Sequence, residues 1–298
     1  MTDLFAAGLA NNEVPAGAGS PPVGSRLGRA RAQRLLVTLL GDYGRASRDP
    51  IPSAALVRIL EEFGIAAANA RATLSRLTQR GLLERTKVGR RTSYAPTEQA
   101  LRLLERGGQR IFSLDDGAAW DGTWTLIAFS VPVDDGDLRR LLRARLRWLT
   151  FWPLFDATWV TPHDRADAVR EQLVELDFAD ALVLRTTDLE LLPGGMARLH
   201  EAWQLDALGD AYADYLLTYQ PLHRRAAAGT VPPEEALVQR TELVDDWRRL
   251  IRDDPDLPAR FLPPDFPRAQ AREVFLATYA ALARPAGERF AHLVRAGA

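Results

Sequence analysis

The fold of the N-terminal region is decided by residues 53–95, whose sequence is SAALVRILEEFG IAAANARATLSRLTQRG LLERTKVGRRTSYA. Apolar residues recur at helical spacing from Ser53 to Phe63 and again from about Ala66 to Arg80, and a glycine follows each segment. The short connection around Gly64 is typical of a helix-turn-helix. The stripe that we expect to be buried on the second helix consists of Ala67, Ala70, Leu74 and Leu77.

A change of period after this helix predicts a β-hairpin. Leu82–Val88 and Arg91–Ala95 have the composition of two short strands, separated by a glycine and an arginine. A helix over Arg29–Leu40 is expected before the helix-turn-helix, and another over Glu98–Phe112, capped by Thr97, after the hairpin. Three helices followed by a hairpin predict a winged helix-turn-helix domain over residues 26–113.

The charge distribution supports a nucleic-acid-binding role for this domain. Residues 26–110 contain 17 basic and 7 acidic residues, a balance of +10. The chain as a whole has a net charge of −1, and residues 111–298 have a balance of −9. A basic module attached to an acidic body is typical of a DNA-binding domain with a separate sensing or assembly domain.

Helical rotation predicts which side chains face DNA. With Leu74 at the centre of the buried stripe, the second helix of the helix-turn-helix presents an outward face to the major groove. We expect Arg76 to bind guanine, and Asn69 or Gln79 to bind adenine, whereas the small Ala72 and Ser75 permit close approach. Arg71 lies on the flank of this face. On the hairpin, the expected phosphate contacts are Arg85, Lys87, Arg90, Arg91 and Thr92. A winged helix that binds a protein partner is the alternative.

The middle of the chain predicts a ferredoxin-like α/β domain over residues 118–192. Its expected order is strand, helix, strand pair, helix and strand. The segments are Trp124–Val131, Leu138–Leu149, Phe151–Thr161, Asp164–Leu176 and Ala181–Leu189. The C-terminal region, residues 195–298, is predicted to be a helical domain with helices over Arg198–Tyr219, Pro233–Arg252 and Arg268–Arg284, and a further one after Pro285.

Several classes of protein are disfavoured. Residues 1–25 lack the basic and apolar regions of a signal peptide and are expected to be a disordered tail, and no apolar run is long enough to span a membrane. The absence of cysteine removes thiol chemistry and fits a cytoplasmic protein. The four histidines lack metal-ligand spacing, and no nucleotide-binding or hydrolase motif is present. We therefore expect a protein without catalytic residues, metal or cofactor.

Several motifs resemble the PaaX family of bacterial repressors. In the N-terminal region they are Leu36–Tyr43 (LVTLLGDY), Arg71–Leu77 (RATLSRL) and Val88–Tyr94 (VGRRTSY). Further along the chain they are Trp120–Leu126 (WDGTWTL), Arg145–Leu149 (RLRWL) and Trp159–Asp164 (WVTPHD). The resemblance implies a winged helix, a middle domain similar to the Cas2 nuclease fold and a helical C-terminal domain. It also implies a homodimer on a near-palindromic operator, with repression relieved by an aryl-CoA thioester such as phenylacetyl-CoA.

Candidate effector residues come from the middle region, which contains five of the seven tryptophans. These tryptophans either build a core or line a pocket for an aromatic acyl group, with Arg143, Arg145 or Arg147 meeting CoA phosphates. The effector candidates are Arg143, Arg147, Trp148, Trp152, Trp159 and His163. The Cas2 likeness also leaves open a metal-dependent nuclease. However, Asp134 and Asp135 follow Pro132 after the first strand and are predicted to form a turn and a helix cap.

Overall fold

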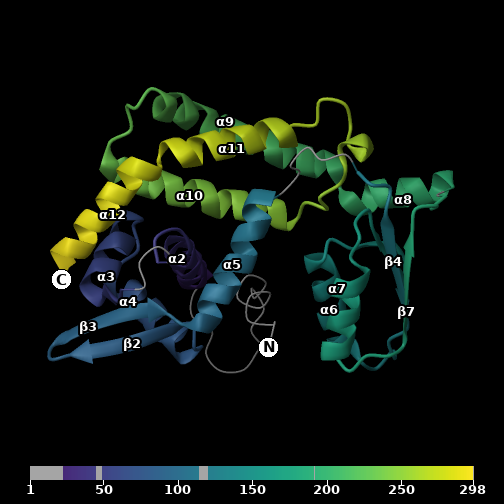
Figure 1. Ribbon diagram of the computed structural model, residues 1–298, viewed down its shortest axis with the longest axis horizontal. Helices are drawn as coiled ribbons and strands as arrows, with labels where there is room; N and C mark the ends of the chain where they lie inside the picture. The colour runs from purple at the N-terminus through teal and green to yellow at the C-terminus, as the bar shows by residue number, and fades with distance from the viewer. Residues whose placement is uncertain (1–22, 45–48, 114–119, 191, 298) are drawn as a thin grey trace. The chain divides into compact units, whose positions relative to one another are not determined.

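The computed structural model describes residues 23–44, 49–113, 120–190 and 192–297 (Figure 1). It is a mixed α+β protein with two small antiparallel sheets. Residues 1–22 of the expected tail lie outside the described residues, and residues 23–25 already belong to helix α2 (Val23–Asp42). None of the helices in the described part of the chain combines the length and apolarity needed to cross a membrane.

The described residues form two compact units, and each is assembled from separate stretches of the chain. One unit contains the described residues of 114–214 and 250–269. The other contains those of 11–113, 215–249 and 270–298. The helical C-terminal region therefore contributes to both units.

The N-terminal elements follow the expected order. After α2 come α3 (Ser53–Glu62), α4 (Ala67–Gln79), β2 (Leu83–Val88), β3 (Arg91–Pro96) and α5 (Glu98–Ser113). Leu35, Ile59 and Leu74, from three different helices, are each at most 1% exposed. Gly64 adopts φ +72° between α3 and α4, a conformation that favours glycine, so the tight turn depends on this residue.

A two-residue strand, β1 (Ile51–Pro52), was not predicted from the sequence. It pairs with β3, so that the first sheet has the order β1-β3-β2. Two residues are too few to show a strand period, and a proline is unusual within a strand except at an edge. β1 occupies such an edge position and joins the start of α3 to the hairpin.

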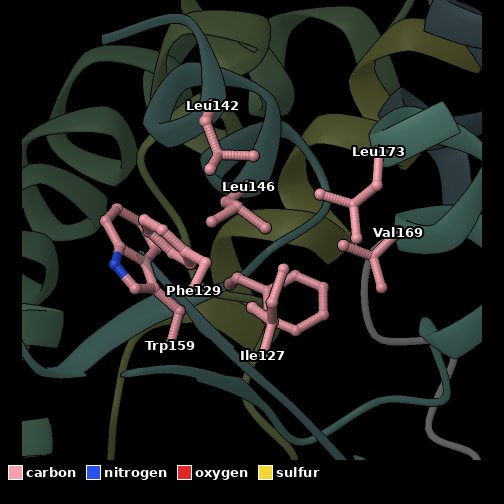
Figure 2. Close-up of a cluster of buried hydrophobic side chains, with 8 residues drawn as sticks. Ile127, Phe129, Leu142, Leu146, Trp159, Val169 and Leu173 are labelled. Atoms are coloured by element: carbon pink, nitrogen blue, oxygen red, sulfur yellow. The ribbon is translucent and has the colours of Figure 1, made fainter. Parts of the chain in front are cut away.

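The second sheet has the topology expected of a ferredoxin-like unit. The elements are β4 (Trp124–Phe129), α6 (Gly136–Trp148), β5 (Trp152–Phe155), β6 (Thr158–Thr161), α7 (Ala166–Glu175) and β7 (Ala181–Thr186). The strand order is β5-β6-β4-β7, and every neighbouring pair is antiparallel. Ile127, Phe129 and Trp159 from the sheet pack against Leu142, Leu146, Val169 and Leu173 from α6 and α7 (Figure 2).

The helices of the C-terminal region are α8 (Pro193–Trp203), α9 (Leu205–Ala227), α10 (Pro233–Arg252), α11 (Arg268–Ala281) and α12 (Ala283–Gly297), with a 3₁₀ turn at Ala259–Phe261. The prediction of one helix over Arg198–Tyr219 is wrong, because Gln204 adopts a left-handed conformation (φ 50°) and separates α8 from α9. The sequence offered no glycine or proline to mark this break. The last helix begins at Ala283 rather than after Pro285, which its first turn accommodates.

Within the second unit, helices from the end of the chain pack on the N-terminal elements. The indole of Trp247 donates to the carbonyl oxygen of Ile111 (3.0 Å) and stacks on Phe275, with ring centroids 4.8 Å apart. Helix α12 packs against α3, and Arg58 donates to the carbonyl oxygen of Ala296 (2.9 Å). The N-terminal elements are therefore supported by residues that lie 136 and 238 positions away in the sequence.

Candidate nucleic-acid interface

Helix α4 has one face that is open to solvent. Ala70, Leu74 and Leu77 are buried on the opposite side, as the apolar spacing predicts. Of the residues predicted to lie on or beside this face, Arg71, Ala72, Ser75 and Gln79 are exposed. Because the two smallest of these lie between the longer side chains, the backbone of α4 can approach a partner surface closely.

Arg76 and Asn69 are half-buried rather than fully exposed, and both are hydrogen-bonded to Thr73. Thr73 is 0% exposed, and its hydroxyl donates to the carbonyl oxygen of Asn69 (2.8 Å). The same hydroxyl oxygen accepts a hydrogen bond from Nη2 of Arg76 (2.9 Å). Thr73 was missing from the predicted buried stripe, whereas Ala67, which was included, is half-buried. The sequence signal for this contact was the threonine three positions before Arg76, since residues at that spacing lie side by side on a helix.

The hairpin presents basic side chains on both of its faces. Arg85, Lys87, Arg90 and Arg91 are exposed, and Thr92 is half-buried. Lys87 pairs with Thr92 in the register and shares a face with it, whereas Arg91 lies opposite Val88 on the other face. Val88, at the tip, is 75% exposed. The tip can therefore meet an anionic surface from either side.

Thr97 ties the base of this hairpin to helix α5. Its hydroxyl donates to the carbonyl oxygen of Gly81 (2.8 Å) and accepts from the backbone N–H of Ala100 (3.1 Å). The second bond is a helix N-cap, as predicted. Leu83 and Tyr94 are buried at the same end, so the hairpin is anchored at its base while its tip is exposed.

In the ferredoxin-like unit, three of the candidate effector residues lie together. The guanidinium of Arg147 lies 4.0 Å from the ring centroid of Trp152 and 5.6 Å from that of Trp159. Partial burial lowers the pKa of Arg147, and the nearby Asp253 opposes this. The two rings are 7% and 3% exposed, and their buried indole N–H groups have no hydrogen-bond partner among the described residues.

The other arginine and aromatic candidates lie in different surroundings. Arg143 is exposed on α6, and Trp148 is 36% exposed at the end of this helix. Arg145 is not available for a phosphate, because it is 8% exposed and donates to Glu175 on α7 (3.0 Å). Nε2 of His163 lies 2.7 Å from the carbonyl oxygen of Asp256.

Of the two carboxylates that follow β4, Asp134 and Asp135, the second caps helix α6, as predicted. Asp135 is the N-cap of α6, and its Oδ1 accepts from the backbone N–H of Leu138 (3.0 Å). Across the described residues, no group of three or more histidine, cysteine, aspartate or glutamate side chains has the arrangement of a metal site.

Comparison with known families assigns the class of protein. Three family models match in succession, described as PaaX-like protein (residues 31–100), PaaX protein central Cas2-like domain (117–197) and PaaX-like protein C-terminal domain (203–292). These matches and the sheet topology define the class of protein, a multidomain regulator with a Cas2-like central domain. The chain belongs to the PaaX family.

Two individual proteins are similar over most of the chain. The transcriptional repressor PaaX of Escherichia coli (strain K12) is 28% identical over 250 residues, which cover 82% of this chain and 78% of the repressor. An uncharacterized protein of Mycobacterium tuberculosis, Rv0674, has a similar fold, with a TM-score of 0.54 at 23% identity. That similarity covers 87% of this chain and 96% of the mycobacterial protein.

Proposed function

We propose that this chain is a cytoplasmic DNA-binding transcriptional repressor. Residues 26–113 form a winged helix-turn-helix that binds double-stranded DNA, and residues 118–192 and 195–298 form the ferredoxin-like and helical domains. The observation that carries the proposal is the exposed face of α4 beside an exposed basic hairpin. Similarity to a repressor supports the same function. Its activity is binding rather than catalysis.

In this proposal α4 enters the major groove. Ala72 and Ser75 allow close approach, and Gln79 and Arg71 reach base edges from the exposed face. Arg76 binds guanine from the flank, where the Thr73 hydroxyl orients its guanidinium. The arginines and the lysine of the hairpin bind phosphates, and these contacts contribute affinity rather than sequence choice.

A homodimer places two such modules on a near-palindromic operator, since a two-fold protein reads a two-fold site. The operator controls an operon for aromatic-acid or acyl-CoA catabolism, and an aryl- or acyl-CoA releases the repressor. Support for an effector site comes from Arg147, Trp152 and Trp159, which combine a cation, two aromatic faces and two unpartnered buried N–H donors among the described residues.

Binding to DNA is tested by titrating the protein against the region upstream of its own operon across a salt series. We expect affinity to fall steeply as salt rises. Arg90→Ala should weaken binding to all sequences alike, whereas Arg76→Ala should reduce the difference between operator and unrelated DNA. No binding, or binding independent of salt, would contradict the proposal.

The effector is tested by thermal shift with a panel of acyl-CoA thioesters. A ligand at about 100 times its dissociation constant stabilises the folded state by about 2.7 kcal/mol. Trp152→Phe removes one indole N–H while retaining an aromatic ring, and it should reduce the shift. An equal shift for this variant would exclude the Trp152 N–H from the site.

A further inference from the structure

The last helix of the chain, α12, runs antiparallel to α3, the first helix of the proposed helix-turn-helix (Figure 1). Nε of Arg289, in the middle of α12, donates to Glu62 at the end of α3 (3.0 Å). About two turns later on α12, the carbonyl oxygen of Ala296 accepts from Nη1 of Arg58, which lies nearer the start of α3 (2.9 Å). The C-terminal end of α12 therefore lies beside the first turns of α3.

Two close contacts hold this end of α12 in place. A Cβ on Gly297 would lie 2.7 Å from the backbone nitrogen of Ala55, so a residue with a side chain could not approach α3 as closely. The guanidinium of Arg58 bonds to the carbonyl oxygen of Ala296, in the last turn of α12, where carbonyl groups lack donors within the helix and a cation is favoured. The helix also packs against β1, the strand that leads into α3. The end of α12 is therefore a fixed part of the surface around α3.

The ionic side chains of α12 are paired except near this end. Arg284, in the first turn, pairs with Glu288 (3.0 Å), and Arg289 pairs with a glutamate of α3. Arg295, in the last turn, is exposed and forms no ion pair with a carboxylate of the described residues. Arg58 is also exposed and has no such carboxylate partner. Two guanidinium groups without counter-ions are thus located where the end of α12 meets α3.

The position of α3 indicates which anion these groups would meet. In a helix-turn-helix, the first helix crosses the DNA backbone while the second enters the major groove. We propose that Arg295 of α12 binds a phosphate of the DNA backbone, next to the one that Arg58 of α3 contacts. The inference rests on the proposed function and extends it, because it adds the C-terminal helix to a DNA interface otherwise formed by residues 26–113.

A phosphate contact of this kind has a defined consequence. It contributes affinity and fixes the orientation of the module on the duplex, but it does not distinguish one base from another. An acidic protein surface could also neutralise the two arginines. Such a partner would leave the salt dependence of DNA binding unchanged when Arg295 is removed, so the measurement below separates the two.

The contact is tested by titrating full-length protein with the DNA upstream of its own operon across a salt series. Each phosphate contact contributes about 0.9 to the slope of log K against log salt. Arg295→Gln removes the charge and retains a side chain that suits a helix. We therefore expect the loss of affinity between 50 and 200 mM salt to be about 3.5-fold smaller than for the wild type. Affinity at low salt should fall equally for operator and unrelated DNA.

Arg284→Gln is the matched control, because it removes the same charge from the same helix. The two positions are roughly 16 Å apart along the helix axis, which exceeds the screening length of about 10 Å at 0.1 M salt. The control should therefore have the salt slope of the wild type.

Proximity to DNA is measured separately with a tethered cleavage reagent. The natural chain contains no cysteine, so Arg295→Cys provides a single thiol for an iron chelate. This protein should cut the DNA backbone at a fixed position within its footprint, and Arg284→Cys with the same chelate should cut it several-fold less. An unchanged salt slope for Arg295→Gln, or no cutting from position 295, would overturn the contact and leave the repressor standing. A wild type that does not bind DNA would overturn both.

Discussion

At the scale of single residues, Thr73 connects the core of the N-terminal module to its candidate DNA-binding face. Its methyl group lies on the buried side of α4, while its hydroxyl bonds to both the Asn69 carbonyl and the Arg76 guanidinium. A threonine hydroxyl can donate one bond and accept another, and both capacities are used here. Thr73 is therefore a positioning residue, since it restricts the conformations of Arg76 before DNA is present.

The first prediction concerns Thr73→Val. Loss of a hydrogen bond to a side chain is worth about 0.5–1.5 kcal/mol, so operator affinity should fall about two- to tenfold. Affinity for unrelated DNA should not change, because the hairpin is unaltered. Thr78→Val is the control, since the Thr78 hydroxyl donates to the carbonyl oxygen of Leu74 (3.0 Å). Equal losses for both variants in binding titrations would exclude a positioning role.

His163 is a second informative residue, in the ferredoxin-like unit. Burial and the neighbouring Arg165 together lower the pKa of His163 from 6.5 to about 4, although the hydrogen bond to the Asp256 carbonyl opposes the shift. A carbonyl oxygen only accepts, so the neutral imidazole carries its proton on Nε2. The protonated form is disfavoured in the folded protein.

The second prediction follows from this shift. In the unfolded chain the imidazole of His163 takes up a proton near pH 6.5, whereas in the folded protein it does so only near pH 4. The stability that neutral His163 provides is therefore complete above pH 6.5 and is lost as the pH falls toward 4. At pH 5 the loss is up to about 2 kcal/mol.

Urea denaturation of wild type and His163→Gln at pH 7.5 and pH 5 checks this expectation. The stability advantage of the wild type should shrink at pH 5. Carboxylates elsewhere titrate in both proteins, so their effects cancel in the comparison. A constant difference between the two pH values would contradict the depressed pKa.

At the scale of elements, the hairpin of β2 and β3 depends on its turn. Val88 pairs with Arg91, which leaves Gly89 and Arg90 as a two-residue loop. Gly89 has φ +61°, and a positive φ at the first loop position is typical of a type II′ turn. A Cβ added to Gly89 would meet nothing within 4 Å, so the requirement for glycine is conformational rather than steric crowding.

The third prediction is that Gly89→Val weakens DNA binding without unfolding the protein. Left-handed backbone costs a non-glycine residue roughly 1–2 kcal/mol, which corresponds to about a 5- to 30-fold loss of affinity. The loss should be similar for operator and unrelated DNA, because the hairpin contacts phosphates. Gly229→Val is the matched control: Gly229 has φ +67° and the same open surroundings, but joins α9 to α10. Unchanged DNA affinity for Gly89→Val would argue against the hairpin as a DNA contact.

At the scale of the whole molecule, a buried ionic network joins three distant parts of the second unit. The guanidinium of Arg240 on α10 donates to Asp42 at the end of α2 (2.8 Å) and to the hydroxyl of Tyr43 (3.1 Å). Its Nε donates to the carbonyl oxygen of Tyr279 on α11 (3.1 Å). Burial raises the pKa of Asp42, although Arg240 and the Tyr279 hydroxyl oppose the shift.

The fourth prediction is that Arg240→Met destabilises the protein by about 3 kcal/mol, because it leaves Asp42 buried without its cation. Urea denaturation measures this effect. The double variant with Asp42→Asn should recover part of the loss. Arg225→Met is the control: it breaks an exposed ion pair with Glu235 and should change the urea midpoint of unfolding little. Equal effects of the two single variants would contradict a special role for the buried network.

Much of the fold was predictable, because the spacing of apolar residues along the chain indicates the type of each helix or strand directly. The helix over Pro233–Arg252, the hairpin strands and the order of the ferredoxin-like elements all follow from the periodicity of apolar residues and from helix and turn signals. The break at Gln204 was not predictable, since an ordinary residue adopts the left-handed conformation there. Among the candidate DNA-binding residues, rotation about α4 predicted the exposed Ala72, Ser75 and Gln79, whereas Asn69 and Arg76, expected on the same face, are half-buried.

The sequence by itself determined the class of most elements, the basic N-terminal module and the family, because these depend on composition, periodicity and local motifs. Tertiary structure alone decided which distant segments support that module, how Thr73 orients Arg76 and which strand is left as an edge. These features depend on pairs of residues far apart in the chain or on one side-chain conformation. A periodic pattern shows that a residue is buried, but packing decides which residues contact it.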